Sequence, residues 1–495
     1  MLAAGDAPPP AEPRQFRAAW VATVANIDWP SRPGLGAAEQ QAEARAILER
    51  ARALGLNALV LQIRPAGDAL YASRLEPWSE VLSGQQGRPP KPWWDPLAFW
   101  VREAHRRGLQ LHAWFNPFRA RHSSAKSPLA RPHIALRSPA SVKAYGDLLW
   151  MDPGDAAARA HTLAVIEDVL RRYDIDGVHI DDYFYPYPLA APDGSGDLAF
   201  PDSEAYLRYL GEGGALPLPD WRRAFVDSFV AELHRRVRRV RPQVLVGISP
   251  FGLGRPERRA AGIAGFSQYD KLYADVERWL AEGWLDYLAP QLYWPVDSAG
   301  QPFVPLLRHW AEANVQRRHL WPGLYTSAPW PAREVLQQVA LLQGTSATSE
   351  GGSAAAGGHI HFSMAALMQD RDGIATQLQR GPYASAALVP PTPWLGEQAP
   401  PPPRLMRLGW PGRPGRPGRL PQGDDAVLVE AGGGRGEAAA ASLSAWAVWR
   451  RIEGRWQFAV VPATERRIAR ERADAVVVSA VDRLGNTSAR MALRW

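Results

Sequence analysis

Two adjacent carboxylates, Asp181 and Asp182, stand at the end of an apolar run in the segment GVHIDDYFYP (177–186). Paired carboxyl groups can divide acid–base work, because one can hold a proton while the other is ionised. The apolar residues before them predict a buried strand, and the aromatic residues after them would help to bury a carboxyl group. A simpler interpretation is a turn, because Asp is common where strands end.

Several other apolar runs carry polar residues at alternate positions near their ends. Alternate residues of a strand share one face, so each set below would point the same way. A polar face confined to strand ends predicts the floor of a site, with Asp181 pointing inward and Asp182 just beyond the strand on a loop. The sets are Gln62 with Arg64, His112 with Trp114 and Asn116, His179 with Asp181, Gln291 with Tyr293, and His359 with His361 and Ser363.

Strand-like and helix-like segments alternate along most of the chain. Amphipathic stretches, such as 37–55 and 221–242, separate the strand segments. This alternation predicts an α/β fold, a (β/α)8 barrel whose site lies at the carboxyl ends of the strands. A doubly wound open sheet is the alternative, but no GxGxxG follows the first strand. The predicted strands are 17–24, 57–65, 109–117, 177–183, 244–250, 285–294, 319–326 and 358–364.

Changes in composition predict four segments. Residues 1–13 are rich in Pro and Ala and are expected to be a disordered tail; residues 14–385 form the barrel, with a low-complexity loop at 344–358. Residues 386–403 predict a stiff proline linker. Residues 404–495 contain short alternating segments and predict a small antiparallel β-sandwich of the fibronectin type III kind, with the PGR repeat at 411–419 as a loop.

The composition narrows the function classes. The 495 residues include 21 Trp and no Cys, and the net charge is +7. The absence of Cys excludes disulfides, zinc–thiolate sites and a thiol nucleophile. Trp has a large apolar face with a polar edge, which suits core packing and also the stacking of sugars. No nucleic-acid motif is visible, no apolar run is long enough to span a membrane, and the first residues do not resemble a secretion leader.

Three of the histidines on predicted inward faces, His179, His359 and His361, raise the question of a metal ion. The two histidines of HIH, His359 and His361, are alternate strand residues and could hold an ion together. No acidic residue lies near them in the sequence, so polar histidines with ordinary hydrogen-bond partners are the favoured interpretation. We therefore expect no metal and no cofactor.

Six segments, in order, resemble the bacterial glycosyl-hydrolase-like family of (β/α)8 barrels related to family-10 glycoside hydrolases. The likeness covers roughly residues 14–385, and the C-terminal part is similar to a fibronectin-type appendage of some members. The family includes a divisome-localized glycoside hydrolase that acts on peptide-free peptidoglycan glycans. The six segments are FRAAWVATVANIDWPS, LQIRPAGDALYASRLEPWSEVLSG, HAWFNPFR, GVHIDDYFYP, ISPFG and DYLAPQLYW.

This resemblance implies a glycosidase that cleaves denuded peptidoglycan strands in the periplasm or cell envelope. A cell-division or envelope protein could bind through the C-terminal part. Glycoside hydrolysis normally uses two carboxyl groups, one as acid and one as nucleophile or base. We expect Asp181 to be the nucleophile or base, and Glu76 or Asp182 to be the acid.

The expected substrate-binding residues offer hydrogen bonds to sugar hydroxyls or flat faces for stacking on sugar rings. Two alternatives remain open: a barrel that binds glycans without cutting them, and a metal-dependent polysaccharide deacetylase that uses His179 and the HIH pair. The expected substrate-binding set is Arg64, Asp68, Asn116, His179, Gln291, Tyr293, Trp294, Trp114, Trp29 and His361.

Overall fold

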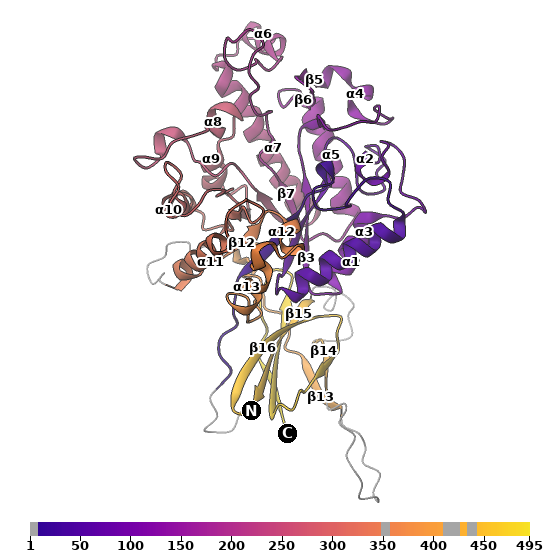
Figure 1. Cartoon of the computed structure of the whole chain (residues 1–495), viewed down its shortest axis with the longest axis vertical. Coiled ribbons are helices and arrows are strands. Elements are labelled where there is room, and N and C mark those ends of the chain that lie inside the picture. The colour runs from indigo at the N-terminus through magenta and orange to yellow at the C-terminus, as the bar shows by residue number, and fades with distance from the viewer. Residues whose placement is uncertain (1–7, 348–356, 409–425, 433–442) are drawn as a thin grey trace, which may run out of the picture.

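The computed structural model describes residues 8–347, 357–408, 426–432 and 443–495. A large parallel sheet with helices forms the upper part of Figure 1, and two small antiparallel sheets form the lower part. All eight predicted strand segments contain a strand. The nine strands of the parallel sheet are β1 (Phe16–Val21), β2 (Ala58–Arg64), β3 (Gln110–Phe115), β7 (Gly177–Ile180), β8 (Leu245–Ile248), β9 (Tyr287–Leu288), β10 (His319–Leu320), β11 (Gly323–Leu324) and β12 (Gly358–His361).

The parallel sheet curls until its two edges meet in one stretch of chain. Its strand order is β10-β9-β8-β7-β3-β2-β1-β12-β11. The two edge strands, β10 and β11, are separated only by Trp321 and Pro322. β10 pairs with β9 on one side, and β11 pairs with β12 on the other. Together, β10 and β11 correspond to the single predicted strand 319–326. The first part of this segment pairs with β9, and the later part pairs with β12.

The two faces of the curled sheet bury different side chains. Alternate residues of β1, among them Phe16 and Trp20, enter an inner cluster with Ile360. The residues between them, Ala19 and Val21, pack in the outer cluster between the sheet and its helices. Both phases of these strands are therefore buried, as expected for a parallel sheet that is covered on both faces.

Helices follow most of the parallel strands and cover the outer face of the sheet (Figure 1). Local signals set their ends: the Asp155 side chain caps α5, and Gly55, with φ +77°, follows α1. The helices are α1 (Ala37–Ala53), α2 (Glu80–Ser83), α3 (Pro96–His105), α4 (Ile134–Arg137), α5 (Ala156–Arg172), α6 (Ser203–Gly211), α7 (Leu218–Val240), α8 (Gln268–Lys271), α9 (Val276–Ala281), α10 (Phe303–Ala313), α11 (Ala332–Ala347), α12 (Met364–Met368) and α13 (Ile374–Arg380).

The C-terminal residues form two antiparallel sheets of three and four strands, in the orders β13-β14-β17 and β16-β15-β18-β19. Val427 of the smaller sheet packs with Trp446 and Val478 of the larger one, so a core lies between the two sheets. The strands are β13 (Arg404–Leu408), β14 (Ala426–Glu430), β15 (Leu443–Ile452), β16 (Arg455–Pro462), β17 (Arg467–Ala469), β18 (Ala475–Asp482) and β19 (Met491–Arg494).

The C-terminal sheets dock on the amino ends of the parallel strands. Arg483, just after β18, pairs with Asp174 at 2.6 Å and with Asp176 at 3.5 Å, and both carboxylates precede β7. The opposite end of the parallel sheet carries α6 and a three-stranded sheet inserted after β3 (Figure 1). The carboxyl ends of the parallel strands therefore face away from the C-terminal sheets. The inserted strands are β4 (Arg119–Arg121), β5 (Val142–Tyr145) and β6 (Leu148–Met151).

Some expected segments differ from the structure or lie outside it. Residues 1–7, 348–356 and the PGR repeat at 411–419 are outside the described residues. Arg490 donates hydrogen bonds to the carbonyl oxygens of Pro9 and Pro10, inside the segment expected to be a disordered tail. Residues 344–347, expected as loop, continue α11. The proline-rich segment 386–403 packs on the parallel sheet, where the indole of Trp394 donates to Asp286.

Among the described residues, no helix combines the length and apolarity that crossing a membrane requires.

Candidate active site

Asp181 follows β7 and lies at the carboxyl end of the parallel sheet, as predicted. It is 3% exposed. Its Oδ2 accepts hydrogen bonds from the Trp114 indole at 2.9 Å and from the Asn116 amide at 3.1 Å. The amide oxygen of Asn116 in turn accepts from the backbone of Arg119 at 2.8 Å. The predicted inward set of β3 therefore lies against the predicted carboxylate of β7.

Burial raises the pKa of Asp181 to about 7. The Arg119 guanidinium offsets part of this effect, and the neighbouring Asp182 adds to it. A carboxyl group with such a pKa is partly protonated at neutral pH, so it can either give or take a proton there.

Asp182 is also 3% exposed, but its hydrogen-bond partners differ from those of Asp181. The Tyr187 hydroxyl donates to its Oδ2. Burial raises the pKa of Asp182, while hydrogen bonds from Tyr187 and Gln291 oppose the rise. The Gln291 amide also donates to the carbonyl oxygen of Ser249 at 3.0 Å. The two adjacent carboxyl groups thus have separate hydrogen-bond partners, and both favour the protonated form more than a free Asp does.

A buried hydrogen-bond chain lies beneath Asp181. The Trp20 indole and the Ser249 hydroxyl both approach Nε2 of His179, at 3.1 and 2.9 Å. An indole N–H can only donate, so Nε2 is the acceptor and the ring is neutral with its proton on Nδ1. That proton points at the Tyr287 hydroxyl at 2.9 Å, and the hydroxyl can then donate to His112 at 3.0 Å. Burial lowers the pKa of both histidines, which agrees with neutral rings.

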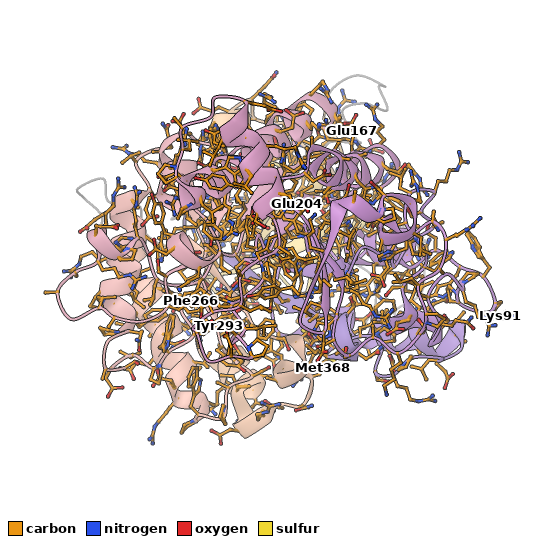
Figure 2. The ribbon with its side chains drawn as sticks, turned by 90° about the horizontal axis from the view of Figure 1, so that it is seen from above. Lys91, Glu167, Glu204, Phe266, Tyr293 and Met368 are labelled. Atoms are coloured by element: carbon orange, nitrogen blue, oxygen red, sulfur yellow. The ribbon has the colours of Figure 1, made fainter. Side chains whose placement is uncertain are left out.

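Partly exposed aromatic residues surround the two carboxylates. Tyr187 stacks on Phe266 at 5.1 Å, and Tyr293 lies 5.1 Å from Tyr325 between ring centroids. Trp294 packs edge-on against Phe251, 5.5 Å away. Figure 2 looks down on this end of the molecule and labels Tyr293 and Phe266 of this rim. The predicted Tyr293 and Trp294 therefore lie in this aromatic rim.

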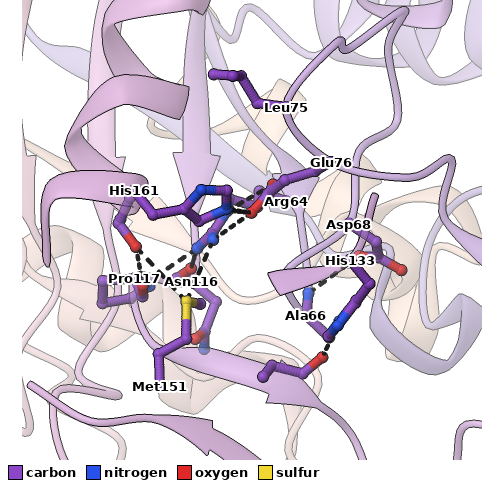
Figure 3. Close-up of polar contacts among 12 residues, drawn as sticks. Arg64, Ala66, Asp68, Leu75, Glu76, Asn116, Pro117, His133, Met151 and His161 are labelled. Atoms are coloured by element: carbon purple, nitrogen blue, oxygen red, sulfur yellow. Dashed lines mark hydrogen bonds and ion pairs between the residues drawn. The ribbon is translucent and has the colours of Figure 1, made fainter. Parts of the chain in front are cut away.

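Glu76 and Arg64 form a buried ion pair (Figure 3). Nε and Nη2 of Arg64 donate to the Glu76 carboxylate at 2.8 and 2.5 Å, and His161 of α5 contacts it at 2.9 Å. Burial alone would raise the pKa of Glu76, but Arg64 and His161 bring it down to about 2. This carboxylate therefore favours the ionised form, which does not suit the role of acid that the sequence led us to expect for Glu76.

Arg64 also differs from its predicted direction. The ladder between β2 and β3 shifts between Gln62 and Arg64, so that Arg64 is level with Phe115. Phe115 packs in the outer cluster, and the Arg64 side chain likewise points outward, toward α5. This irregularity removes Arg64 from the expected substrate-binding set.

Two further expected residues, Trp29 and His361, lie outside the site. Trp29 is fully buried against Trp100, and its indole donates to Gln40 in α1, so it is a core residue. His361 is level with Ala19, which belongs to the outer cluster, and its ring bonds Tyr383 and Thr326 behind the sheet. Its inward neighbour is Ile360 instead.

Asp68 lies in a loop after β2 and faces a separate cavity. Burial raises the pKa of Asp68 to about 6, and a hydrogen bond from Ser79 opposes the rise. The cavity is lined by residues that include Glu80 of α2 and His122, and neither Asp181 nor Asp182 lines it. A larger cavity of about 180 Å³ lies at the opposite end of the sheet, where Asp176 and Arg483 meet. None of the expected catalytic residues lines that cavity.

The histidines do not form a shared metal site. His179 points into the inner cluster, whereas His359 and His361 face the Tyr383 hydroxyl on the outer side. Among the described residues, no group of three or more His, Asp or Glu side chains is arranged to hold an ion. The donor set that the deacetylase alternative required is therefore not brought together.

Five residues of the site were not identified from the sequence: Trp20, Arg119, Tyr187, Ser249 and Tyr287. The alternation along their strands could have indicated two of them. Ser249 stands two residues after Gly247, and Tyr287 stands four residues before Gln291, so each shares the inward phase of its strand. Arg119 and Tyr187 lie on loops, where no periodicity indicates direction.

The sequence matches a known protein family and is similar to several named proteins. The family model described as glycosyl hydrolase-like 10 matches residues 15–329. Glycosyl hydrolase YngK of Bacillus subtilis (strain 168) is 38% identical over 410 residues, which is 80% of this chain and 77% of that protein. Glycosyl hydrolase DigH of Escherichia coli (strain K12) is 34% identical over 341 residues, which is 64% of this chain and 75% of that protein.

Among solved structures, the glycoside hydrolase domain of PgaB (BpsB) from Bordetella bronchiseptica is 13% identical, with a TM-score of 0.48. It covers 74% of this chain and 98% of that one. The family model spans β1 to β11, so it includes both carboxylates and the strands that position them. The chain belongs to the glycosyl hydrolase-like 10 family.

Proposed function

We propose that this chain is a glycoside hydrolase whose sheet works as a (β/α)8 barrel and whose carboxyl pair is Asp181 and Asp182. The observation that carries the proposal is the raised pKa of both carboxyl groups at the carboxyl ends of the strands, inside an aromatic rim. Its relatives are named glycosyl hydrolases, which supports the reaction class. Two carboxyl groups with separate partners can supply the acid and the nucleophile or base of glycoside cleavage.

We assign the proton donor to Asp181, in place of the nucleophile or base expected from the sequence. Its pKa of about 7 leaves a proton available at neutral pH. The Trp114 and Asn116 donors and the nearby Arg119 favour the carboxylate that remains after the proton has gone to the leaving oxygen. Asp182 is then the second carboxylate, which attacks the anomeric carbon or activates water, with Tyr187 holding its orientation.

The proposed substrate is the peptide-free glycan strand of peptidoglycan. The support for it is the family resemblance of the six sequence segments, together with a rim of tyrosine and tryptophan rings that suits sugar faces. The periplasm or cell envelope is the matching location. The three- and four-stranded antiparallel pair supports a fibronectin type III-like unit at 404–495, through which an envelope or cell-division protein could bind.

The test is a digest of purified peptide-free glycan strands by the wild type, Asp181→Asn and Asp182→Asn, with the products identified by mass spectrometry. We expect short saccharides from the wild type and a loss of at least about 100-fold in rate from each variant. Asp147→Asn is the matched comparison, because Asp147 is an exposed carboxylate in the turn between β5 and β6 and takes no proton in this scheme. Equal product yields from the wild type and Asp181→Asn would contradict the assignment.

A glycan-binding barrel that does not cut is the second candidate. The observation that favours it is the 3% exposure of both Asp181 and Asp182, which leaves the carboxyl groups little contact with solvent. In that case the wild type would retain glycan strands on an affinity column, would release no saccharides, and would bind as tightly as Asp181→Asn. The digest and the column experiment together separate the two candidates.

A further inference from the structure

An arginine beside the two carboxyl groups carries a charge that the described residues leave without an ion pair. Arg119 follows β3 at the carboxyl end of the sheet and is 4% exposed. Its charge lowers the pKa of both Asp181 and Asp182, so the guanidinium lies near the pair. By contrast, Arg64 and Arg222, which are also buried, each pair with a carboxylate, at 2.5 and 2.6 Å. A buried cation without a paired anion is costly, so the unpaired state of Arg119 calls for a reason.

The chain engages only part of the Arg119 guanidinium. Nη1 donates to the carbonyl oxygen of Pro65 at 3.3 Å. The central carbon of the guanidinium lies 4.2 Å from the centroid of the Tyr183 ring, and the Tyr183 hydroxyl can take one further hydrogen bond. A guanidinium has more N–H donors than these two contacts use. The backbone of Arg119 donates to Asn116, whose amide also donates to Asp181, so one side chain places both residues.

The N–H groups that remain are open to a ligand. Several side-chain atoms of the described residues lack both a hydrogen-bond partner and contact with solvent, and no nitrogen of Arg119 is one of them. An Arg119 nitrogen that the chain does not engage therefore keeps some accessible surface, although the residue as a whole is buried. A ligand that lies against the carboxyl pair would meet this surface.

A carboxylate suits this arginine best. The planar fork of a guanidinium matches the geometry of a carboxylate, and hydrogen bonds between ionised groups are stronger than those between neutral groups. In the chain by itself, Asp181 and Asp182 both favour the protonated form, so they balance the charge of Arg119 only in part. A bound anion would supply the rest of the balancing charge.

We propose that Arg119 binds a carboxylate of the glycan and makes the site select acidic sugar chains over neutral ones. This role rests on the proposed glycosidase function and deepens it. In peptidoglycan, every second sugar carries a lactyl ether, whose carboxyl group is free when the peptide is absent and is part of an amide when the peptide is attached. An arginine that requires the free carboxylate would therefore accept peptide-free strands and discriminate against strands that keep their peptides.

The test compares a glycan acid with its ester in a protein that does not cut. Peptide-free peptidoglycan fragments, and the same fragments with their carboxyl groups converted to methyl esters, are titrated by calorimetry into Asp181→Asn. The titrations are repeated after adding Arg119→Met, which removes the charge, or Arg119→Lys, which keeps the charge without the planar fork. Arg308→Met is the matched control, because Arg308 is exposed on α10, whose buried side packs in the outer cluster.

We expect the acid to bind Asp181→Asn about 10- to 100-fold more tightly than the ester, which is the effect of hydrogen bonds between charged groups. Arg119→Met should abolish this preference, Arg119→Lys should keep part of it, and Arg308→Met should leave it unchanged. The affinity for the ester should stay nearly the same in all of these variants. If Arg119→Met does not fold, the ratio in Asp181→Asn and its reduction by Arg119→Lys still decide. Equal affinities for acid and ester, or a preference that survives Arg119→Met, would overturn the proposal.

The result is separable from the proposed function. Cleavage of the acid and the ester by the wild type with the same kcat and KM would leave the glycosidase standing and remove the role of Arg119. A preference for the acid that depends on Arg119, with no cleavage by the wild type, would retain a site for acidic glycans and remove the glycosidase.

Discussion

Asp181→Asn should stabilise the folded protein above neutral pH. Asp181 is 3% exposed, and burial raises its pKa from 3.8 to about 7 even with Arg119 nearby. The unfolded chain releases this proton near pH 3.8, whereas the folded chain keeps it up to about pH 7. The folded state therefore binds more protons between these values. Its stability from this group is complete below about pH 4 and is lost as the pH rises through about 7.

The magnitude follows from the two pKa values. A rise of about 3 units, at about 1.36 kcal/mol per unit, corresponds to about 4 kcal/mol of lost stability at pH 8. Asn does not ionise, and its amide oxygen can still accept from Trp114 and Asn116. We expect the substitution to change the free energy of unfolding by less than about 1 kcal/mol at pH 4 and to raise it by up to about 4 kcal/mol at pH 8.

Urea unfolding, followed by tryptophan fluorescence at pH 4, 6 and 8, measures this difference. Asp147→Asn is the control, since Asp147 is an exposed residue in the turn between β5 and β6. The control should give the same difference from the wild type at each pH. A gain from Asp181→Asn that is equal at pH 4 and pH 8, or a destabilisation that grows with pH, would refute the reasoning.

Three other perturbations test the surrounding contacts. Glu76→Gln leaves the Arg64 guanidinium buried without its carboxylate, so urea unfolding at pH 7 should show a loss of about 3–5 kcal/mol. Tyr187→Phe removes a hydrogen bond that lowers the pKa of Asp182, so the limb of the pH–rate profile controlled by Asp182 should move to higher pH. Tyr287→Phe breaks the link between the two buried histidines, and unfolding experiments should show a loss of about 1–3 kcal/mol. A limb that stays in place, or stabilities within error of the wild type, would contradict these assignments.

The eight strand positions and the direction of Asp181 could be predicted because both depend on local pattern. Apolar runs bounded by turn residues locate a buried strand. In β3 and β7 the polar phase and the inner phase coincide, so Trp114, Asn116 and Asp181 were correctly placed together. The carboxyl ends of parallel strands lie at one end of the sheet, so polar residues at these ends could be predicted to share one site.

The errors arose where alternation does not determine direction. In β12, both Ile360 and its histidine neighbours are buried, so composition alone could not show which phase faces inward. Arg64 turned outward because of a shift in the ladder, and a shift in pairing depends on the neighbouring strand rather than on local sequence. Trp29 lies on a loop, where its contact with Trp100 is set by tertiary packing.

Because the C-terminal sheets lie at the amino ends of the parallel strands, immobilisation through the C-terminus would orient the protein in one way. The last residue, Trp495, is bonded to the backbone of Asp474, at the end of the molecule opposite to the carboxylates (Figure 1). A chain captured on a sensor surface through a tag after Trp495 would therefore present Asp181 and its aromatic rim to the flowing solution. Long glycans, which need open space on both sides of the cleaved bond, would approach that face without obstruction from the support.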